Sequence, residues 1–182
     1  GARALKAPNV YAVLARVDGE PVGATLLHES HGIAGVYWVA VLEEARGLFH
    51  DLGNVDQEAR CTGLLGNVAV GEGDLDAATA RFGEAAEIAR ATGNEFRLAA
   101  NLANLGTVAS FRDDAHTALR YQTEAVEIQR RLEDFDNLAI TQHNVGRGHL
   151  FLGQLEEARA ALSESFAVAH ELGFRQVMAY CL

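Results

Sequence analysis

The chain has 182 residues, of which 49% are hydrophobic and 22% are charged, so it has enough apolar side chains for a folded core and lacks the composition of a disordered segment. Its formal net charge of −10 repels nucleic-acid phosphates and favours a neutral or basic protein or peptide as the partner. The longest apolar run, residues 32–42, is shorter than the roughly 20 residues that a membrane span takes, and no signal pattern precedes it. We therefore expect a soluble, cytoplasmic protein that binds neither nucleic acid nor membranes.

The residue types that carry catalysis or metal binding are sparse. Cys61 and Cys181 are far apart and form no Cys-x-x-Cys pair, which argues against a disulfide framework or a zinc site. His28 and His31 have the spacing of a metal-binding pair on a helix, but the sequence offers no third ligand. Nucleophile elbows and phosphate-binding Gly-Lys-Ser/Thr loops are absent. We expect no catalytic residue, no metal and no cofactor.

The N-terminal quarter of the chain is rich in β-branched and aromatic residues. Residues 10–17 and 22–29 flank an Asp-Gly pair, which is a strong signal for a hairpin turn. A third run, residues 34–42, would complete a small antiparallel β-meander. We predict that residues 1–42 form a β-rich segment that covers the end of the structure that follows, through Tyr37, Trp38 and Val39.

Residues 10–47 resemble the central strands of a GNAT-type acetyltransferase, with "YAVLARVDGEPVGATLL" followed by "GIAGVYWVAVLEEARG". The resemblance implies a loop at Arg46 and Gly47 whose backbone amides would hold the pyrophosphate of acetyl-CoA. Phe49 and Asp51 occupy positions where that loop requires small residues, and the carboxylate of Asp51 would repel phosphate. An acetyl-CoA-dependent N-acetyltransferase, or a cofactor-binding remnant of one, is therefore the alternative function.

The junction near residue 43 has two further interpretations. Residues 43–53 already follow the pattern of the repeats described next, so the chain could be a chimera, in which two ancestries or two engineered halves were joined. Alternatively, the whole N-terminus is a decayed first repeat with residues 23–35 as its first helix, although the glycines and β-branched residues there disfavour a helix.

The rest of the chain repeats itself every 40 residues. Shifting the sequence by this period aligns three independent columns, which are Gly66, Gly106 and Gly146, then Ala78, Ala118 and Ala158, then Ile88, Ile128 and Val168. Self-similarity at a fixed period of this length is typical of a solenoid. Each unit is predicted to hold two helices, as in residues 98–110 and 115–131, separated by a turn such as "RDD". Small Gly and Ala side chains let the paired helices approach closely.

Residues 58–182 resemble tetratricopeptide repeats. The resemblance is carried by the Leu-Gly pair of the first helix and by the Ala, aromatic and Ala positions of the second helix. Leu65, Gly66, Ala78, Phe82 and Ala85 match this pattern, whereas the second copy has Gln122 in the aromatic position. The amino-acid sequence of these repeats is similar to that of repeats in bacterial signal-transduction ATPases and regulators. We predict a mainly α fold, a TPR-like α-solenoid, with a partial repeat at 43–57, repeats at 58–97, 98–137 and 138–176, and the start of a further helix at 177–182.

This resemblance implies a groove lined by the first helices of successive repeats. The residues that it places in the groove are Arg60, Gly63, Asn67, Val70, Ala103, Asn104, Thr107, Ser110, His143, Asn144, Arg147 and Leu150. Asparagine carboxamides both donate and accept hydrogen bonds, so they suit the backbone of an extended peptide, unless they bond to a neighbouring helix or to water instead. The only lysine is Lys6, so the lysines with which some members clamp a terminal carboxylate are missing.

The favoured function is thus a non-enzymatic scaffold that binds a peptide or a partner domain in this groove. The chain ends in "VMAYCL", which suggests a piece of a longer protein. Apolar residues there, Val177, Tyr180 and Leu182, also predict self-association through an open end of the solenoid.

Overall fold

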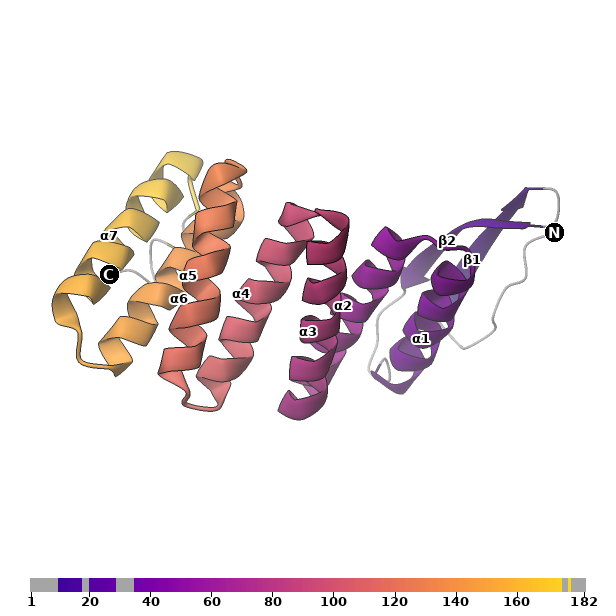
Figure 1. Ribbon diagram of the computed structural model, residues 1–182, viewed down its shortest axis with the longest axis horizontal. Coiled ribbons are helices and arrows are strands. Elements are labelled where there is room, and N and C mark those ends of the chain that lie inside the picture. The colour runs from indigo at the N-terminus through magenta and orange to yellow at the C-terminus, as the bar shows by residue number, and fades with distance from the viewer. Residues whose placement is uncertain (1–9, 18–19, 29–34, 175–176, 178–182) are drawn as a thin grey trace.

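The computed structural model describes residues 10–17, 20–28, 35–174 and 177. A two-stranded hairpin is followed by α-helices that lie in a row along the long axis of the molecule (Figure 1). The elements are β1 (Val10–Val17), β2 (Glu20–His28), α1 (Gly35–Asp51), α2 (Val55–Glu72), α3 (Leu75–Thr92), α4 (Glu95–Phe111), α5 (Ala115–Arg131), α6 (Phe135–Phe151) and α7 (Leu155–Leu172). The predicted α-solenoid is confirmed, and the predicted helix over residues 115–131 coincides with α5.

Consecutive helices are joined by short turns with a shared cap. Gly73 takes a left-handed conformation at the end of α2, and the side chain of Asp74 then accepts a hydrogen bond from the amide of Ala77 at 2.9 Å. Left-handed residues end helices and Asp or Asn side chains start them, because both satisfy backbone groups that the helix leaves free. The same cap recurs at 20-residue intervals, at Asn54, Asp74, Asn94, Asp114 and Asp134.

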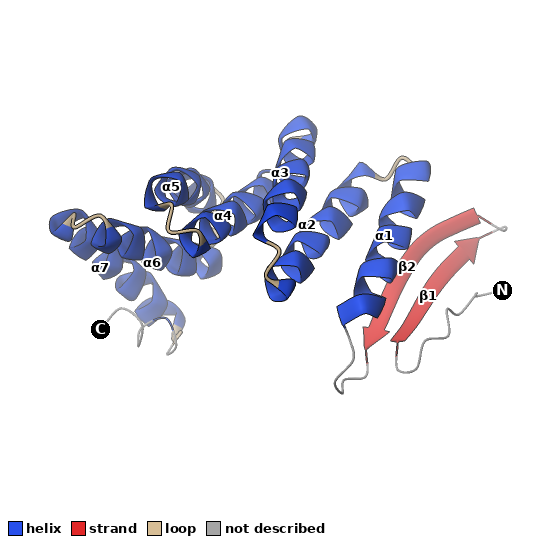
Figure 2. Ribbon diagram, turned by 90° about the horizontal axis from the view of Figure 1, so that it is seen from below, coloured by secondary structure: helices blue, strands red, loops and turns tan. Residues whose placement is uncertain are grey.

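The core lies between successive helices, both within a repeat and between neighbouring repeats. Phe82 of α3 is 1% exposed and packs in one cluster with Leu102 and Leu105 of α4. A second cluster joins Val126 of α5 to Leu138 and other residues further along the chain. Because each helix buries apolar side chains against the next one in sequence, the row of helices in Figure 2 has a continuous core.

Arginine–carboxylate pairs connect neighbouring repeats across their exposed edges. Arg97 of α4 donates to Asp56 of α2 through both Nε and Nη2, at 2.7 and 2.9 Å, and this lowers the pKa of Asp56 below its usual range. Further pairs between repeats are Arg46 with Glu84, Arg81 with Glu43, Arg90 with Glu124, Arg112 with Asp76 and Arg130 with Glu164. Arg131 pairs with Glu95 within one repeat, between α5 and α4. Exposed pairs of this kind each contribute only about 0–1 kcal/mol to stability.

The N-terminal region differs from the prediction in one respect. Residues 35–42, predicted as a third strand, form the first half of α1 (Figure 1). Valines and aromatics in an apolar run do not by themselves distinguish a strand from a helix, and this run continues into residues that already obey the repeat pattern. The first two predicted strands correspond to β1 and β2, which pair antiparallel with Tyr11 opposite Leu27. Among the described residues, the N-terminal sheet consists of β1 and β2.

No helix in the described part of the chain is long and apolar enough to cross a membrane. The predicted self-association surface falls largely outside the described residues, because Tyr180 and Leu182 are not among them. Most of the predicted further helix, residues 178–182, lies outside them as well, and so does His31 of the candidate metal pair.

Candidate functional site

The first helices of the three repeats, α2, α4 and α6, lie side by side, and we call them the A helices. The second helices, α3, α5 and α7, are called the B helices. All predicted groove residues are on the A helices. Arg60, Asn67, Ser110, Arg147 and Leu150 are exposed, whereas Gly63, Val70, Ala103, Asn104, Thr107, His143 and Asn144 are half-buried. Each is therefore open at least in part, and the groove assignment stays a prediction.

The carboxamides of the asparagines predicted to bind a peptide are free of hydrogen bonds to polar groups of the described residues. The side chains of Asn67, Asn104 and Asn144 make no hydrogen bond to any other residue that the structure describes. Asn101, by contrast, donates a hydrogen bond from its side-chain amide to the carbonyl oxygen of Arg97 at 2.8 Å. Within the described residues, the interpretation that these asparagines bond to a neighbouring helix therefore has no support. Asn104 and Asn144 stand one repeat apart, at matching positions of α4 and α6.

A pocket of about 330 Å³ opens between α4, α5 and α6. It brings together four of the predicted groove residues, which are Thr107, Ser110, Asn144 and Arg147. Its other lining residues are Phe111, Asp113, Ala115, Gln122, Gly148 and Phe151. Arg60, Asn67, Asn104 and His143 lie outside this pocket. The predicted site is therefore partly collected in one place, and this place belongs to the second and third repeats.

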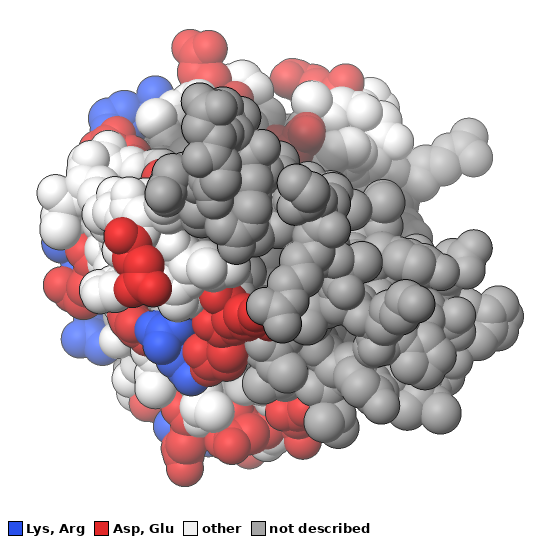
Figure 3. Space-filling view, turned by 90° about the vertical axis from the view of Figure 1, so that its right-hand side faces the viewer, with Lys and Arg blue, Asp and Glu red and all other residues white. Residues whose placement is uncertain are grey.

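The A helices differ from the rest of the chain in charge. Residues 59–71, 98–111 and 138–151 contain no Asp or Glu, and their cations are Arg60 and Arg147. Carboxylates stand on α1, on the B helices, on the turns, on the first turns of the A helices and at Glu72, the last residue of α2. Figure 3 shows acidic and basic groups mixed over the described part of one end. Arg147 makes no ion pair with a described residue, although seven other arginines do. The pocket thus contains a guanidinium that forms no ion pair with a described residue, although the Asp113 carboxylate lines the same pocket.

His143 stands one helical turn before Arg147 on α6. Burial lowers the pKa of His143 below its usual value, and repulsion by the guanidinium of Arg147 lowers it further. The imidazole is therefore neutral at neutral pH, and Arg147 supplies the positive charge on this part of α6.

Four pocket residues were missed by the sequence analysis as functional candidates. Phe111 and Phe151 stand 40 residues apart at the ends of α4 and α6, and they are 59% and 65% exposed. Their common register and aromatic type are a signal that the sequence did contain. Gln122 is visible only as a departure from the aromatic position of the repeat, and Asp113 as an aspartate where Gly73 and Gly153 stand in the other repeats.

Gln122 and Asp113 both have an energetic cost. Gln122 is 1% exposed, and neither the nitrogen nor the oxygen of its amide has a hydrogen-bond partner. Asp113 has a φ of 58°, in the left-handed region that favours glycine. Residues with unfavourable hydrogen bonding or backbone conformation, and no compensating gain in stability, often belong to functional sites.

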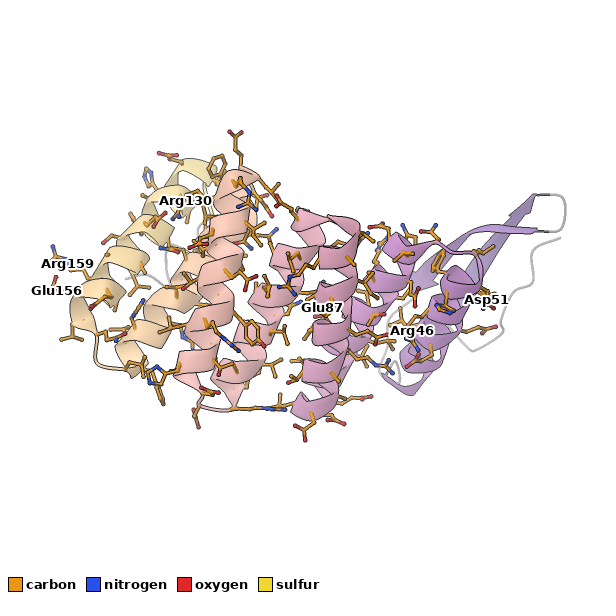
Figure 4. All side chains as sticks on the ribbon, in the orientation of Figure 1. Arg46, Asp51, Glu87, Arg130, Glu156 and Arg159 are labelled. Atoms are coloured by element: carbon orange, nitrogen blue, oxygen red, sulfur yellow. The ribbon has the colours of Figure 1, made fainter. Side chains whose placement is uncertain are left out.

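The predicted cofactor loop at Arg46 and Gly47 is not formed. Both residues lie inside α1, which runs without interruption from residue 35 to 51, so their amides are used within a helix instead of converging on an anion. The guanidinium of Arg46 binds the carboxylates of Glu43 at 3.2 Å and Glu84 at 3.0 Å, and Figure 4 shows this arginine on α1. The geometry here does not support the acetyltransferase alternative.

Stacked helix hairpins with an open face of A helices define a class of protein, the TPR-like α-solenoid. Residues 97–171 match the family model of the tetratricopeptide repeat, which agrees with the resemblance found in the sequence. Proteins with this fold commonly mediate protein–protein interaction. No curated protein sequence matches the chain.

Solved structures with low sequence identity share the fold. Aspartyl phosphate phosphatase F from Bacillus subtilis is 15% identical with a TM-score of 0.76, and the match covers 79% of this chain and 38% of that one. A signal transduction ATPase with a tetratricopeptide repeat sensor from Pyrococcus horikoshii is 14% identical with a TM-score of 0.73, covering 78% and 22%. The TPR domain of Arabidopsis FLU is 17% identical with a TM-score of 0.61, covering 64% and 98%. The chain therefore spans well under half of the first two proteins.

Proposed function

We propose that this chain is a non-enzymatic scaffold that binds an extended peptide segment of a partner protein across its A helices. The observation that carries the proposal is the pocket between α4, α5 and α6, which holds Thr107, Asn144 and Arg147 from two successive repeats. Residues about 40 positions apart in the chain thus present polar groups to the same pocket.

The free carboxamides support this function. Asn104 and Asn144 can each donate to a peptide carbonyl and accept from a peptide amide, and no described residue occupies either group. Their spacing of one repeat would hold an extended chain at two points. Such backbone recognition fits a scaffold, because it tolerates a range of partner sequences.

The neighbours in fold support the same class. One matched structure is a TPR domain by itself, and another carries the repeats as the sensor part of a larger signalling ATPase. By analogy, this chain would serve as the recognition part of a longer protein.

The test is a peptide selection on the purified chain, followed by binding measurements. A library of displayed peptides is selected on the immobilised protein, and the affinity of the recovered peptides is measured by fluorescence anisotropy. We expect the double substitution Asn104→Ala and Asn144→Ala to weaken binding about tenfold or more, since two backbone contacts are lost together.

The matched control replaces two exposed residues of the B helix α5, Thr123 and Glu127, with alanine. This variant should bind the selected peptides as the original chain does. If both double variants bind equally well, or if no peptide can be selected at all, peptide recognition by the A helices is wrong.

A further inference from the structure

The pocket between α4, α5 and α6 has a chemistry of its own, beyond backbone recognition. Phe111 at the end of α4 and Phe151 at the end of α6 both line it, and both present most of their surface to solvent. Large exposed aromatic side chains at equivalent positions of two repeats are unexpected for a face that only has to be soluble. Both rings therefore offer apolar surface to a side chain that enters the pocket.

An aromatic side chain suits such a pocket. Aromatic rings gain about 0.5–1.5 kcal/mol beyond their buried area when they stack or meet edge to face, and they are the residue type that anchors most peptide interfaces. The volume of about 330 Å³ leaves room for the ring and for part of the adjoining backbone.

The charge of the pocket determines which charged group of the peptide can bind beside the aromatic ring. Arg147 lines the same pocket and has no ion-pair partner among the described residues. The whole chain is acidic and predicts a basic partner, but the A helices carry no carboxylate from residue 98 to 111 or from 138 to 151. A guanidinium in such surroundings binds a carboxylate through two parallel hydrogen bonds.

We infer that this pocket receives an aromatic side chain of the partner peptide between Phe111 and Phe151, and that Arg147 binds a carboxylate next to that aromatic residue. The inference rests on the proposed function and specifies its ligand as an aromatic residue flanked by Asp or Glu. Asp113 also lines the pocket, so the ligand carboxylate faces α6 and not the turn between α4 and α5. Gln122 adds an unpaired amide in the pocket wall, which is a further sign that this place is not built for stability alone.

The experiment uses peptides selected on the intact chain as above. We expect them to share an aromatic residue with Asp or Glu beside it. Phe151→Ala should weaken binding about tenfold or more. Its matched control is Phe96→Ala, because Phe96 is 56% exposed at the opposite end of α4, and this control should leave the affinity unchanged.

The charge is tested by reversal. Arg147→Glu should weaken binding about tenfold, and a peptide whose acidic residue is replaced by lysine should recover most of this loss on the variant. Arg159→Glu is the control, since Arg159 is an exposed arginine on α7, away from the pocket (Figure 4). Asp113→Asn should tighten binding of the acidic peptide, because a repulsive charge is removed.

The outcomes separate the two proposals. Peptides that depend on Asn104 and Asn144 but tolerate Phe151→Ala and Arg147→Glu would overturn the aromatic and acidic ligand while the groove function stands. Looser binding after Asp113→Asn, or no recovery in the charge reversal, would likewise overturn the carboxylate assignment. If no peptide is selected, the proposed function itself fails. Circular dichroism melting of each variant shows that a loss of binding is not a loss of fold.

Discussion

The ring of Phe82 on α3 lies directly against the backbone of Gly66 on α2, so that a β-carbon added at Gly66 would stand only 2.6 Å from Cε1 of Phe82. Nonbonded carbon atoms in proteins do not approach each other so closely. The same arrangement recurs in the third repeat, where a β-carbon at Gly146 would stand 2.6 Å from Cγ of Leu162. The glycine column of the sequence is therefore a contact point between the two helices of each repeat.

This contact predicts opposite outcomes for two Gly→Ala substitutions. Gly66→Ala should destabilise the protein by about 1–3 kcal/mol, because the ring of Phe82 must move in a packed core. Gly83→Ala in α3 should stabilise it by up to about 1 kcal/mol, because nothing lies near a β-carbon there and alanine favours helix. Urea unfolding followed by circular dichroism measures both changes. Equal effects at the two sites would contradict the contact.

Gln122 predicts a stabilising substitution. It fills the position that Phe82 and Leu162 fill in the other repeats, but its buried amide has no partner. Gln122→Leu should raise the free energy of unfolding by about 1–3 kcal/mol, because two unpaired polar atoms leave the core. Gln142→Leu is the control, since Gln142 donates to Glu164 at 2.8 Å and loses that bond on substitution. A smaller gain, or a loss, is expected there.

The turn between α5 and α6 offers a second stabilising change. Glu133 has a φ of 56°, whereas glycine stands at the matching positions Gly53, Gly93 and Gly173. Glu133→Gly should stabilise the protein by roughly 0.5–1 kcal/mol, because glycine adopts this conformation without a steric penalty. Gly93→Ala, at a φ of 70°, is the converse and should destabilise it. Thermal melting measures both changes: Tm should rise for Glu133→Gly and fall for Gly93→Ala. A shift of both Tm values in the same direction would contradict the prediction.

The histidine beside the pocket predicts a measurable titration. Burial and then Arg147 lower the pKa of His143 below 6.5, so the folded state prefers the neutral imidazole. The stability that this preference contributes is complete above pH 6.5 and is lost as the pH falls through the lowered pKa. Arg147→Ala should raise the pKa of His143, because one repulsive charge is gone, and NMR titration of the imidazole protons follows this directly. Arg159→Ala should leave it where it is, and an unchanged value after Arg147→Ala would show that burial alone sets it.

Much of the fold could be predicted from the sequence, because the signals are local or periodic. The 40-residue columns of Gly66, Gly106 and Gly146 indicated stacked helix hairpins, and the apolar spacing in residues 115–131 marked α5 to the residue. The caps at Asn54, Asp74 and Asn94 are also visible in the sequence, as Gly-Asn or Gly-Asp pairs 20 residues apart. Residues 35–42 were assigned wrongly, because composition alone does not separate a buried helix from a strand.

The candidate site could be predicted only in part. The family resemblance placed Thr107, Asn144 and Arg147 on one face, but it did not distinguish them from Arg60 and Asn67, which lie outside the pocket. The sequence by itself determined the repeat and its helices, since these depend on contacts a few residues apart or one period apart. Only the tertiary structure decided that Arg147 forms no ion pair with a described residue and that Phe111 and Phe151 line a common pocket. Those properties depend on side chains from three helices at once, and no single segment encodes them.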